Sequence, residues 1–310
     1  LWNTETGEKL RTLEGQASYI AFGPKGKVIA GASSVDGVVR IWSTDKEEPV
    51  HVIKGVPASN RPIAFGPKGR MLVSSNDLKV EVIDVRKGAV GLIDFHAGRV
   101  TSLSITPNGR LVAAGDERFM LHLWNLKSGR VVKLPFHLGP VQSVDISPDG
   151  KKLVSANKRD ITNPRTVAEV RIWDIKKGKL LRAYQPEKPK IDKVVHNIMK
   201  VTFSPDGKLI ALESGDSKLR ILETKTGKCI QTLKDHSPHI GHSTAVFSPD
   251  GRMLAALTTD NTVRLYEPKT GKVLRDLEGG HSLEIHSLAF SPDGRMLVTT
   301  SRDKTALIWG

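Results

Sequence analysis

Short runs in which hydrophobic and polar residues alternate recur along the whole chain. Near the C-terminal end, one apolar run occupies residues 287–290, a proline–glycine turn follows, and a second run occupies residues 295–300. Alternation with a period of two is typical of strands with one buried face, and two such strands joined by a tight turn form a hairpin. A third run follows each hairpin, and a fourth, such as residues 273–277, follows another glycine-containing turn. The pattern therefore predicts units of four short strands.

The turn inside the hairpin recurs seven times, at residues 23–26, 66–69, 106–109, 147–150, 204–207, 248–251 and 291–294. Proline presets φ at the second turn position, and glycine accepts the positive φ that ends the turn. Self-similarity at a period of about 40 to 50 residues indicates a repeat array, and four-stranded repeats are the blades of a propeller. We therefore expect an all-β fold, a seven-bladed β-propeller with four-stranded antiparallel blades.

The third strand of each repeat ends on a bulky residue, and fixed offsets connect other residues to it. The bulky residues are Trp42, Ile83, Trp124, Trp173, Leu222, Tyr266 and Trp309. Six positions earlier stand Asp36, Asp77, Asp216, Asp260 and Asp303, and ten positions before the turn stand His96, His137 and His281. Together with Gly280-His281 in the last repeat, these spacings make essentially the whole chain resemble the WD-repeat β-propeller family.

The resemblance implies a buried hydrogen-bond relay of histidine, aspartate, a hydroxyl and tryptophan. Because a buried imidazole or indole N–H needs an acceptor, such a relay is physically reasonable. For the last repeat it implies His281, Thr299, Asp303 and Trp309, and elsewhere it implies His96, His137, Trp124 and Trp173. The repeats that end at Ile83, Leu222 and Tyr266 lack the indole, so we expect packing to replace the relay there.

We expect residues 1–310 to form one propeller domain. The segment at about residues 8–13 reads as an outer strand without a blade of its own, and we expect it to pair with the C-terminal strands and close the ring. Residues 1–2 duplicate the role of residues 308–309, which suggests that the chain was excised from a longer one. No run approaches the roughly 18 apolar residues of a membrane span. The single cysteine, Cys229, agrees with a reducing, cytoplasmic location.

The net charge of +14 raises the question of a nucleic-acid partner. Much of the excess lies on lysines and arginines of the turns, where Asp149, Asp206, Asp250 and Asp293 partly offset it. Aromatic residues make up only 5% of the chain and do not interleave with the basic ones as base-stacking side chains would. We favour solubilising turn lysines, and binding of nucleic acid or of acidic partners stays as the weaker alternative.

Two insertions interrupt the repeat, at residues 158–168 and 185–196. We expect both to emerge on the face opposite the proline–glycine turns and to meet there. Long loops on a rigid scaffold are usual recognition sites, although an excursion without a partner is the alternative. The partner-binding candidates are basic residues of these loops and of neighbouring loops: Arg99, Arg118, Lys158, Arg159, Arg165, Lys190, Lys193 and Lys200.

Metal and catalytic sites are not indicated. His236, His239 and His242 form a cluster, but no cysteine accompanies it and Asp235 is the one acid nearby, so we expect a structural role and no metal. The sequence contains no nucleophile elbow, no phosphate-binding glycine loop and no His-Glu-x-x-His motif, which favours a protein without catalysis or cofactor. A propeller enzyme would need acids that converge on a central channel, and it stays as a minor alternative.

The function that these observations favour is a protein-interaction scaffold. We expect a monomeric ring that binds a peptide or protein on one face through loop side chains, with no membrane association. An engineered or excised propeller fragment without a partner of its own is the alternative.

Overall fold

The structure of the chain is a computed structural model. It describes residues 13–15, 19–23, 27–33, 36–54, 64–65, 71–76, 79–85, 87, 89–94, 98–160, 163, 166–186, 197–237, 244–303 and 305–310. All regular elements within these ranges are strands, and within them no helix is long and apolar enough to cross a membrane. The chain divides into two compact units, Leu1–Ile146 with Ile175–Lys179, and Ser147–Asp174 with Leu180–Gly310.

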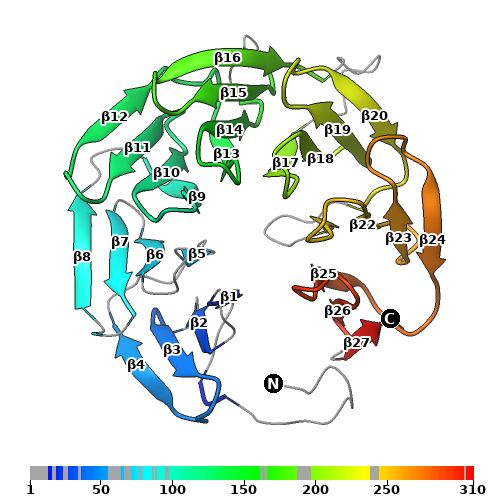
Figure 1. Ribbon diagram of the computed structural model, residues 1–310, viewed down its shortest axis with the longest axis horizontal. Helices are drawn as coiled ribbons and strands as arrows, with labels where there is room; N and C mark the ends of the chain where they lie inside the picture. Colours follow the sequence, from blue (N-terminus) through cyan, green and yellow to red (C-terminus); the bar gives the residue numbers. More distant parts are fainter. Residues whose placement is uncertain are drawn as a thin grey trace. The chain divides into compact units, whose positions relative to one another are not determined.

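The first unit contains three four-stranded antiparallel sheets whose strands lie side by side in chain order (Figure 1). The first is β1 (Tyr19–Phe22), β2 (Val28–Ala32), β3 (Val39–Ser43) and β4 (Pro49–Ile53). The second is β5 (Ala64–Phe65), β6 (Met71–Asn76), β7 (Lys79–Asp84) and β8 (Ala89–Asp94). The third is β9 (Val100–Ile105), β10 (Leu111–Asp116), β11 (Leu121–Asn125) and β12 (Val131–Leu134).

The second unit contains two more such sheets and a shorter one. The four-stranded sheets are β17 (Ile198–Phe203), β18 (Leu209–Ser214), β19 (Lys218–Glu223) and β20 (Cys229–Leu233), then β21 (Ala245–Phe247), β22 (Leu254–Leu257), β23 (Val263–Tyr266) and β24 (Val273–Leu277). The last sheet has three strands, β25 (Ile285–Phe290), β26 (Leu297–Ser301) and β27 (Ala306–Trp309). A further four-stranded sheet, whose residues are divided between the two units, is β13 (Val141–Ile146), β14 (Lys152–Asn157), β15 (Val170–Asp174) and β16 (Lys179–Tyr184).

The prediction of seven four-stranded blades is therefore wrong. Among the described residues, six sheets are complete four-stranded blades, and β25–β27 lacks a fourth strand. The expectation was based on the number of hairpin turns. Each such turn indicates two strands of a blade and gives no information on the outermost strand. The segment at residues 8–13, predicted to supply that strand, lies outside the described residues except for Leu13, which is not in a strand.

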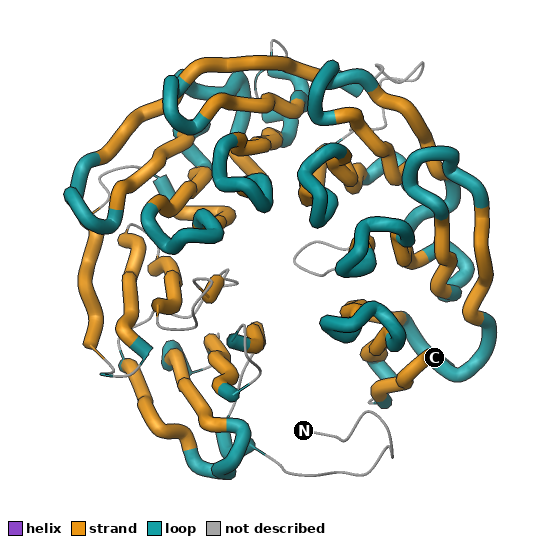
Figure 2. Tube along the Cα trace, viewed as in Figure 1, coloured by secondary structure: helices purple, strands orange, loops and turns teal. Residues whose placement is uncertain are grey.

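Figure 2 shows the loops and turns that connect consecutive strands, and hairpin turns among them carry a serine–aspartate hydrogen bond. In the turn between β13 and β14, the Ser147 hydroxyl donates to Asp149 at 2.6 Å and accepts from the backbone N–H of Lys152 at 2.9 Å. Gly150 closes this turn at φ 69°, a conformation that a side chain disfavours. The same serine–aspartate bond recurs at Ser204, Ser248 and Ser291. Burial raises the pKa of Asp149 and Asp206, but hydrogen bonds from the serine and the backbone outweigh it, and the pKa of all four turn aspartates is lowered.

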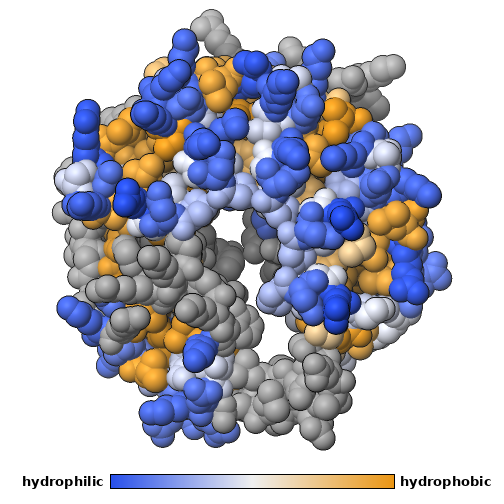
Figure 3. Space-filling view, viewed as in Figure 1, coloured by the Kyte–Doolittle hydropathy of each residue, from blue (hydrophilic) through white to orange (hydrophobic). Residues whose placement is uncertain are grey.

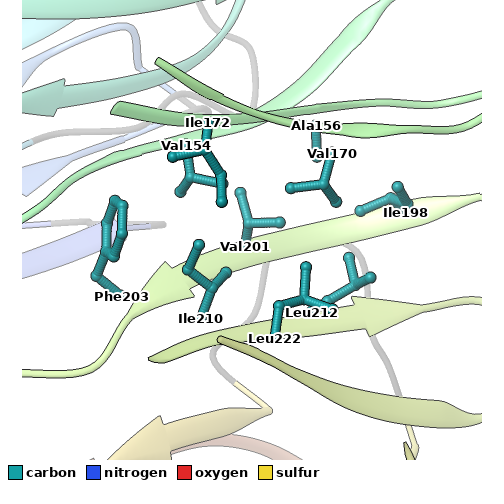
Figure 4. Close-up of a cluster of buried hydrophobic side chains, with 10 residues drawn as sticks. All are labelled: Val154, Ala156, Val170, Ile172, Ile198, Val201, Phe203, Ile210, Leu212 and Leu222. Atoms are coloured by element: carbon teal, nitrogen blue, oxygen red, sulfur yellow. The ribbon is translucent and has the colours of Figure 1, made fainter. Parts of the chain in front are cut away.

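Apolar side chains from the facing strands of neighbouring sheets make the core. Figure 4 shows one such cluster in the second unit, in which side chains of β14 and β15 meet those of β17, β18 and β19. Its members are Val154, Ala156, Val170, Ile172, Ile198, Val201, Phe203, Ile210, Leu212 and Leu222, all buried. Burial of one such aliphatic side chain stabilises a fold by about 1.5 to 3 kcal/mol, so stacked inter-sheet layers account for much of the stability.

In the first unit, a second cluster supports the sheet β9–β12. Trp124 closes β11 and packs in a cluster with Val80 of β7, Val100 of β9 and Val112 of β10. The serines of β9 add polar links, since Ser102 and Ser104 accept hydrogen bonds from the backbone of β13 at 3.0 and 3.1 Å. The loops of this sheet are therefore anchored to a well-packed base.

Candidate functional site

Three loops meet at one end of the sheet β9–β12. The loop before β9 and the β10–β11 turn are joined by a hydrogen bond from the backbone N–H of Glu117 to the carbonyl of Arg99, at 3.0 Å. The loop after β12 joins the same turn through the backbone N–H of His137, which donates to the carbonyl of Phe119 at 2.9 Å. Side chains of all three loops therefore share one surface.

A buried carboxylate links the loop before β9 to the β10–β11 turn. Asp116, at the end of β10, has no exposed surface, and its two oxygens accept from the backbone N–H groups of Gly98 at 3.2 Å and Met120 at 2.8 Å. His122 lies beside it, with Nε2 3.7 Å from the carboxylate, and its ring stacks on Trp124 at 5.6 Å. Because a buried carboxylate is costly unless it is hydrogen-bonded, this arrangement fixes the loop positions.

Exposed side chains of two kinds cover this end of the sheet. Phe136 and Leu138 are 63% and 43% exposed and flank His137, which is fully buried. Arg118 is exposed on the adjoining turn. We call the set Arg99, Glu117, Arg118, Phe136 and Leu138 the basic–apolar surface.

The two arginines of this surface differ in their contacts. Arg99 forms an ion pair with Glu117, with Nη2 and Nε at 2.6 and 3.0 Å from the same carboxylate oxygen. Arg118 makes no hydrogen bond or ion pair with any other residue in the described part of the chain. Its stem crosses the backbone at Gly98, where an added Cβ would lie 2.6 Å from Arg118 Cγ. Glycine at position 98 therefore leaves room for this course of the side chain.

The last sheet brings together the relay residues that the sequence singled out. His281 Nε2 lies 2.7 Å from the Thr299 hydroxyl, and the indole N–H of Trp309 donates to the same hydroxyl at 3.0 Å. His281 Nδ1 lies 3.1 Å from Asp303, which also accepts from the backbone N–H of Ser282 at 2.9 Å. Hydrogen bonds led by that from the Thr305 hydroxyl hold the pKa of Asp303 well below its usual range.

The other relay candidates are placed less uniformly. The indole N–H of Trp173 donates to Ser155 at 2.7 Å, as that of Trp309 does to Thr299. Trp124 and His137 are buried, and His96 lies outside the described residues. In sheet β17–β20, Leu222 of β19 stands where other sheets have the indole. An ion pair adds to packing there, because the buried guanidinium of Arg220 binds both oxygens of Asp216.

The predicted loop surface in the second unit is only partly described. Arg165, Lys190 and Lys193 lie outside the described residues, whereas Lys158, Arg159 and Lys200 are half-buried. The base of the first insertion is well ordered by hydrogen bonds. Asn157 donates to the carbonyl of Val167 at 2.8 Å, and Thr166 donates to those of Asp160 and Asn163 at 2.9 and 2.8 Å.

The histidine cluster is represented by His236 alone, since His239 and His242 lie outside the described residues. His236 is buried, with Nδ1 2.8 Å from the carbonyl of Leu257 and Nε2 3.3 Å from Glu213. Glu213 also accepts from the Thr244 hydroxyl. In the part of the chain that the structure covers, no group of three histidines, cysteines or acids could hold a metal ion.

Sequence reasoning missed four residues of the site: Asp116, Glu117, Phe136 and Leu138. Asp116 stands eight positions before Trp124, whereas the aspartates predicted from the repeat stand six positions before the bulky residue of the third strand. A signal was present, because the position six before Trp124 holds Arg118 and not an acid. Phe136 and Leu138 flank a predicted relay histidine, but they lie in the loop after β12, where no strand pattern predicts which side chains are exposed.

Comparisons with known proteins give the family. The WD40 profile, described as WD domain, G-beta repeat, matches residues 7–43, 89–125, 129–160, 227–267 and 271–310. One curated relative is the WD repeat-containing protein SL1-17 of Schistosoma mansoni, 26% identical over 132 residues, which are 41% of this chain and 43% of that protein. The match thus spans less than half of that relative. Because the profile covers more than half of the chain, the chain belongs to the WD40 repeat family, whose β-propellers generally mediate protein interactions.

Proposed function

We propose that this chain is a non-catalytic interaction module that binds a peptide segment of a partner protein on the basic–apolar surface. One observation carries the proposal: Phe136 and Leu138 are exposed on a loop that is hydrogen-bonded to the turn of Arg118, and Arg118 has no partner within the described residues. The WD40 family assignment supports a binding role of this kind.

The composition of the surface is that of an interaction site. Interfaces are enriched in aromatic residues and arginine, and their energetic centres are apolar anchors surrounded by polar groups. An exposed phenylalanine next to an exposed leucine leaves apolar area in water, and covering it with a partner side chain is favourable.

The rigidity of the loops strengthens the proposal. Asp116 ties the loop before β9 to the β10–β11 turn, and His137 ties the loop after β12 to the same turn. A surface that is already ordered loses little conformational freedom on binding, so more of its contact energy contributes to affinity.

Catalysis receives no support from the acids of the repeat. Asp149, Asp206, Asp250 and Asp293 each bind the serine of their own turn, and Asp303 binds the loop that precedes β25. These carboxylates stabilise turns. A nucleic-acid partner is also less well supported, because aromatic residues make up only 5% of the chain and do not interleave with the basic ones as base-stacking side chains would. On the face that Figure 3 shows, hydrophobic residues lie among the hydrophilic ones.

The test is selection of binders from an unbiased random peptide library displayed on phage. We expect selected peptides to lose binding to the F136S and L138S variants. The control is V131S, because Val131 lies on β12 of the same sheet and is also 43% exposed, as Leu138 is. Selected peptides that bind all three variants equally, or a selection that yields no binders, would contradict the proposal.

A further inference from the structure

We propose, resting on the function above, that the partner segment is acidic, with a carboxylate that binds Arg118 and an apolar side chain that contacts Phe136 and Leu138. The proposal names the chemistry of the partner. The proposal follows from the contacts that the charged and apolar side chains of the basic–apolar surface make with other described residues.

Within the described residues, the guanidinium of Arg118 makes no hydrogen bond or ion pair. In the last sheet the corresponding position, six before the closing tryptophan, holds Asp303, which is bound by Ser282, Thr305 and His281. In sheet β9–β12 the aspartate that accepts from the backbone N–H groups of the loops is Asp116, which stands two positions earlier. Position 118 is thereby released from the loop-holding role, and an exposed arginine occupies it.

The neighbouring arginine shows which group this surface accepts. Arg99 binds the carboxylate of Glu117 through two nitrogens, and both side chains are about half exposed, at 52% and 41%. Guanidinium–carboxylate pairs with two donors are among the stronger and more specific polar contacts. Arg118 follows Glu117 and has no carboxylate partner among the described residues, so a carboxylate from the partner would form a second ion pair.

The apolar part of the surface lies on the loop that is hydrogen-bonded to the Arg118 turn. Phe136 and Leu138 are two residues apart, and the residue between them, His137, is fully buried. The two exposed side chains are therefore close neighbours on one short loop. An apolar side chain of the partner can therefore contact both while its acidic neighbour reaches Arg118.

The charge of the chain as a whole favours the same class of partner. A net charge of +14 attracts acidic segments over long range and disfavours basic ones. Nucleic acid would also be attracted, but its phosphates would bind Arg118 without a requirement for the apolar pair. The two partners therefore respond differently to variants at Leu138.

The experiment uses two pools of synthetic peptides of equal length with the same leucine and phenylalanine content. In one pool aspartate and glutamate separate the apolar residues, and in the other lysine and arginine do so. Binding of each pool, and of a single-stranded oligonucleotide, is measured by fluorescence anisotropy for the wild type and for R118A, L138S, E117Q and R130A. Arg130 is the matched control because it is an exposed arginine in the β11–β12 turn of the same sheet.

We expect the acidic pool to bind and the basic pool not to bind. R118A and L138S should each weaken binding of the acidic pool by about tenfold, whereas R130A should leave it unchanged. E117Q should bind the acidic pool at least as tightly as the wild type, because it frees Arg99 from its internal carboxylate.

Four results would overturn the inference. These are preference for the basic pool, equal losses for R118A and R130A, weaker binding by E117Q, and oligonucleotide binding that depends on Arg118 but not on Leu138 while the acidic pool fails to bind. The proposed function fails separately, through the phage selection, if no binder depends on Phe136 or Leu138. Binders that depend on these residues but are neither acidic nor sensitive to R118A would leave the proposed function standing and remove this inference.

Discussion

In each of the sheets β9–β12 and β25–β27, one aspartate accepts hydrogen bonds from the loops at the end of the sheet. The two aspartates stand at different distances in sequence from the tryptophan of the third strand. In the last sheet, Asp303 stands six residues before Trp309 and accepts from the backbone N–H groups of Ser282 and Thr305 at 2.9 and 2.8 Å. In the other sheet, Asp116 stands eight residues before Trp124 and makes the equivalent pair of bonds to Gly98 and Met120.

The difference shows how a repeat can acquire a binding residue without losing its structure. The requirement is an acceptor for backbone N–H groups of two loops, and a carboxylate at either position can meet it. When the acid stands at the buried earlier position, the exposed later position no longer has a structural role. In sheet β9–β12 that position carries Arg118, which we propose as the partner-binding residue.

The largest expected effect comes from the loss of the buried acid. D116A leaves the N–H groups of Gly98 and Met120 without their acceptor in the interior, so we expect the free energy of unfolding to fall by about 3 kcal/mol. Guanidinium denaturation followed by tryptophan fluorescence measures the change. D116N keeps one acceptor oxygen and should lose less. A change under about 0.5 kcal/mol in D116A would show that Asp116 does not hold the loops.

A smaller loss is expected from the relay of the last sheet. T299V removes the hydroxyl that contacts both His281 and Trp309, and we expect a loss of about 2 kcal/mol in the free energy of unfolding. S155A is the matched variant because Ser155 accepts from Trp173 in the same manner. It should cost about 1 kcal/mol. Equal stability of T299V and the wild type would contradict a relay that contributes to folding.

A double variant tests directly whether the two arrangements are interchangeable. D116S/R118D gives sheet β9–β12 the residues that the last sheet has at Ser301 and Asp303. We expect it to regain about 1 kcal/mol relative to D116S alone, because an aspartate at position 118 can accept from the same loops. Denaturation of the two variants side by side measures the difference. A double variant less stable than D116S would break the comparison.

The smallest expected effect on stability is the pH dependence of Asp303. Its pKa is depressed in the folded protein, chiefly by the hydrogen bond from the Thr305 hydroxyl, so its stabilisation is present above the unfolded pKa of about 3.9 and is lost as the pH falls further. We expect D303N to be less stable than the wild type at pH 7, with the difference shrinking as the pH falls below about 4. Urea denaturation across this range measures it, and a constant difference would contradict the assignment.

Turn and strand patterns predicted much of the fold correctly. The third strands of the repeats form where alternation placed them, for example β23 at Val263–Tyr266 and β27 at Ala306–Trp309. These are local features, set by the proline–glycine turns and by side-chain alternation. The number of complete blades was not predictable in this way, because a fourth strand of the last sheet would have to come from a segment remote in sequence.

The candidate site was less predictable for a physical reason. Fixed offsets find residues that repeat, such as Asp303 and His281, whereas a functional residue is one that departs from the repeat. Arg118 was named from the sequence as a basic residue, but the loop-holding role that an acid has at this position in the last sheet is filled by Asp116, two residues away. That exchange of roles becomes visible only when the backbone N–H groups of Gly98 and Met120 are traced to their acceptor.

The central claim is that Arg118 serves binding and not folding. Its most direct test is to measure, on the same preparation of R118A, the free energy of unfolding and the affinity for the acidic peptide pool. The account predicts unfolding within about 0.5 kcal/mol of the wild type together with binding weakened by about tenfold. A variant that loses stability but keeps its affinity for the peptides would contradict it.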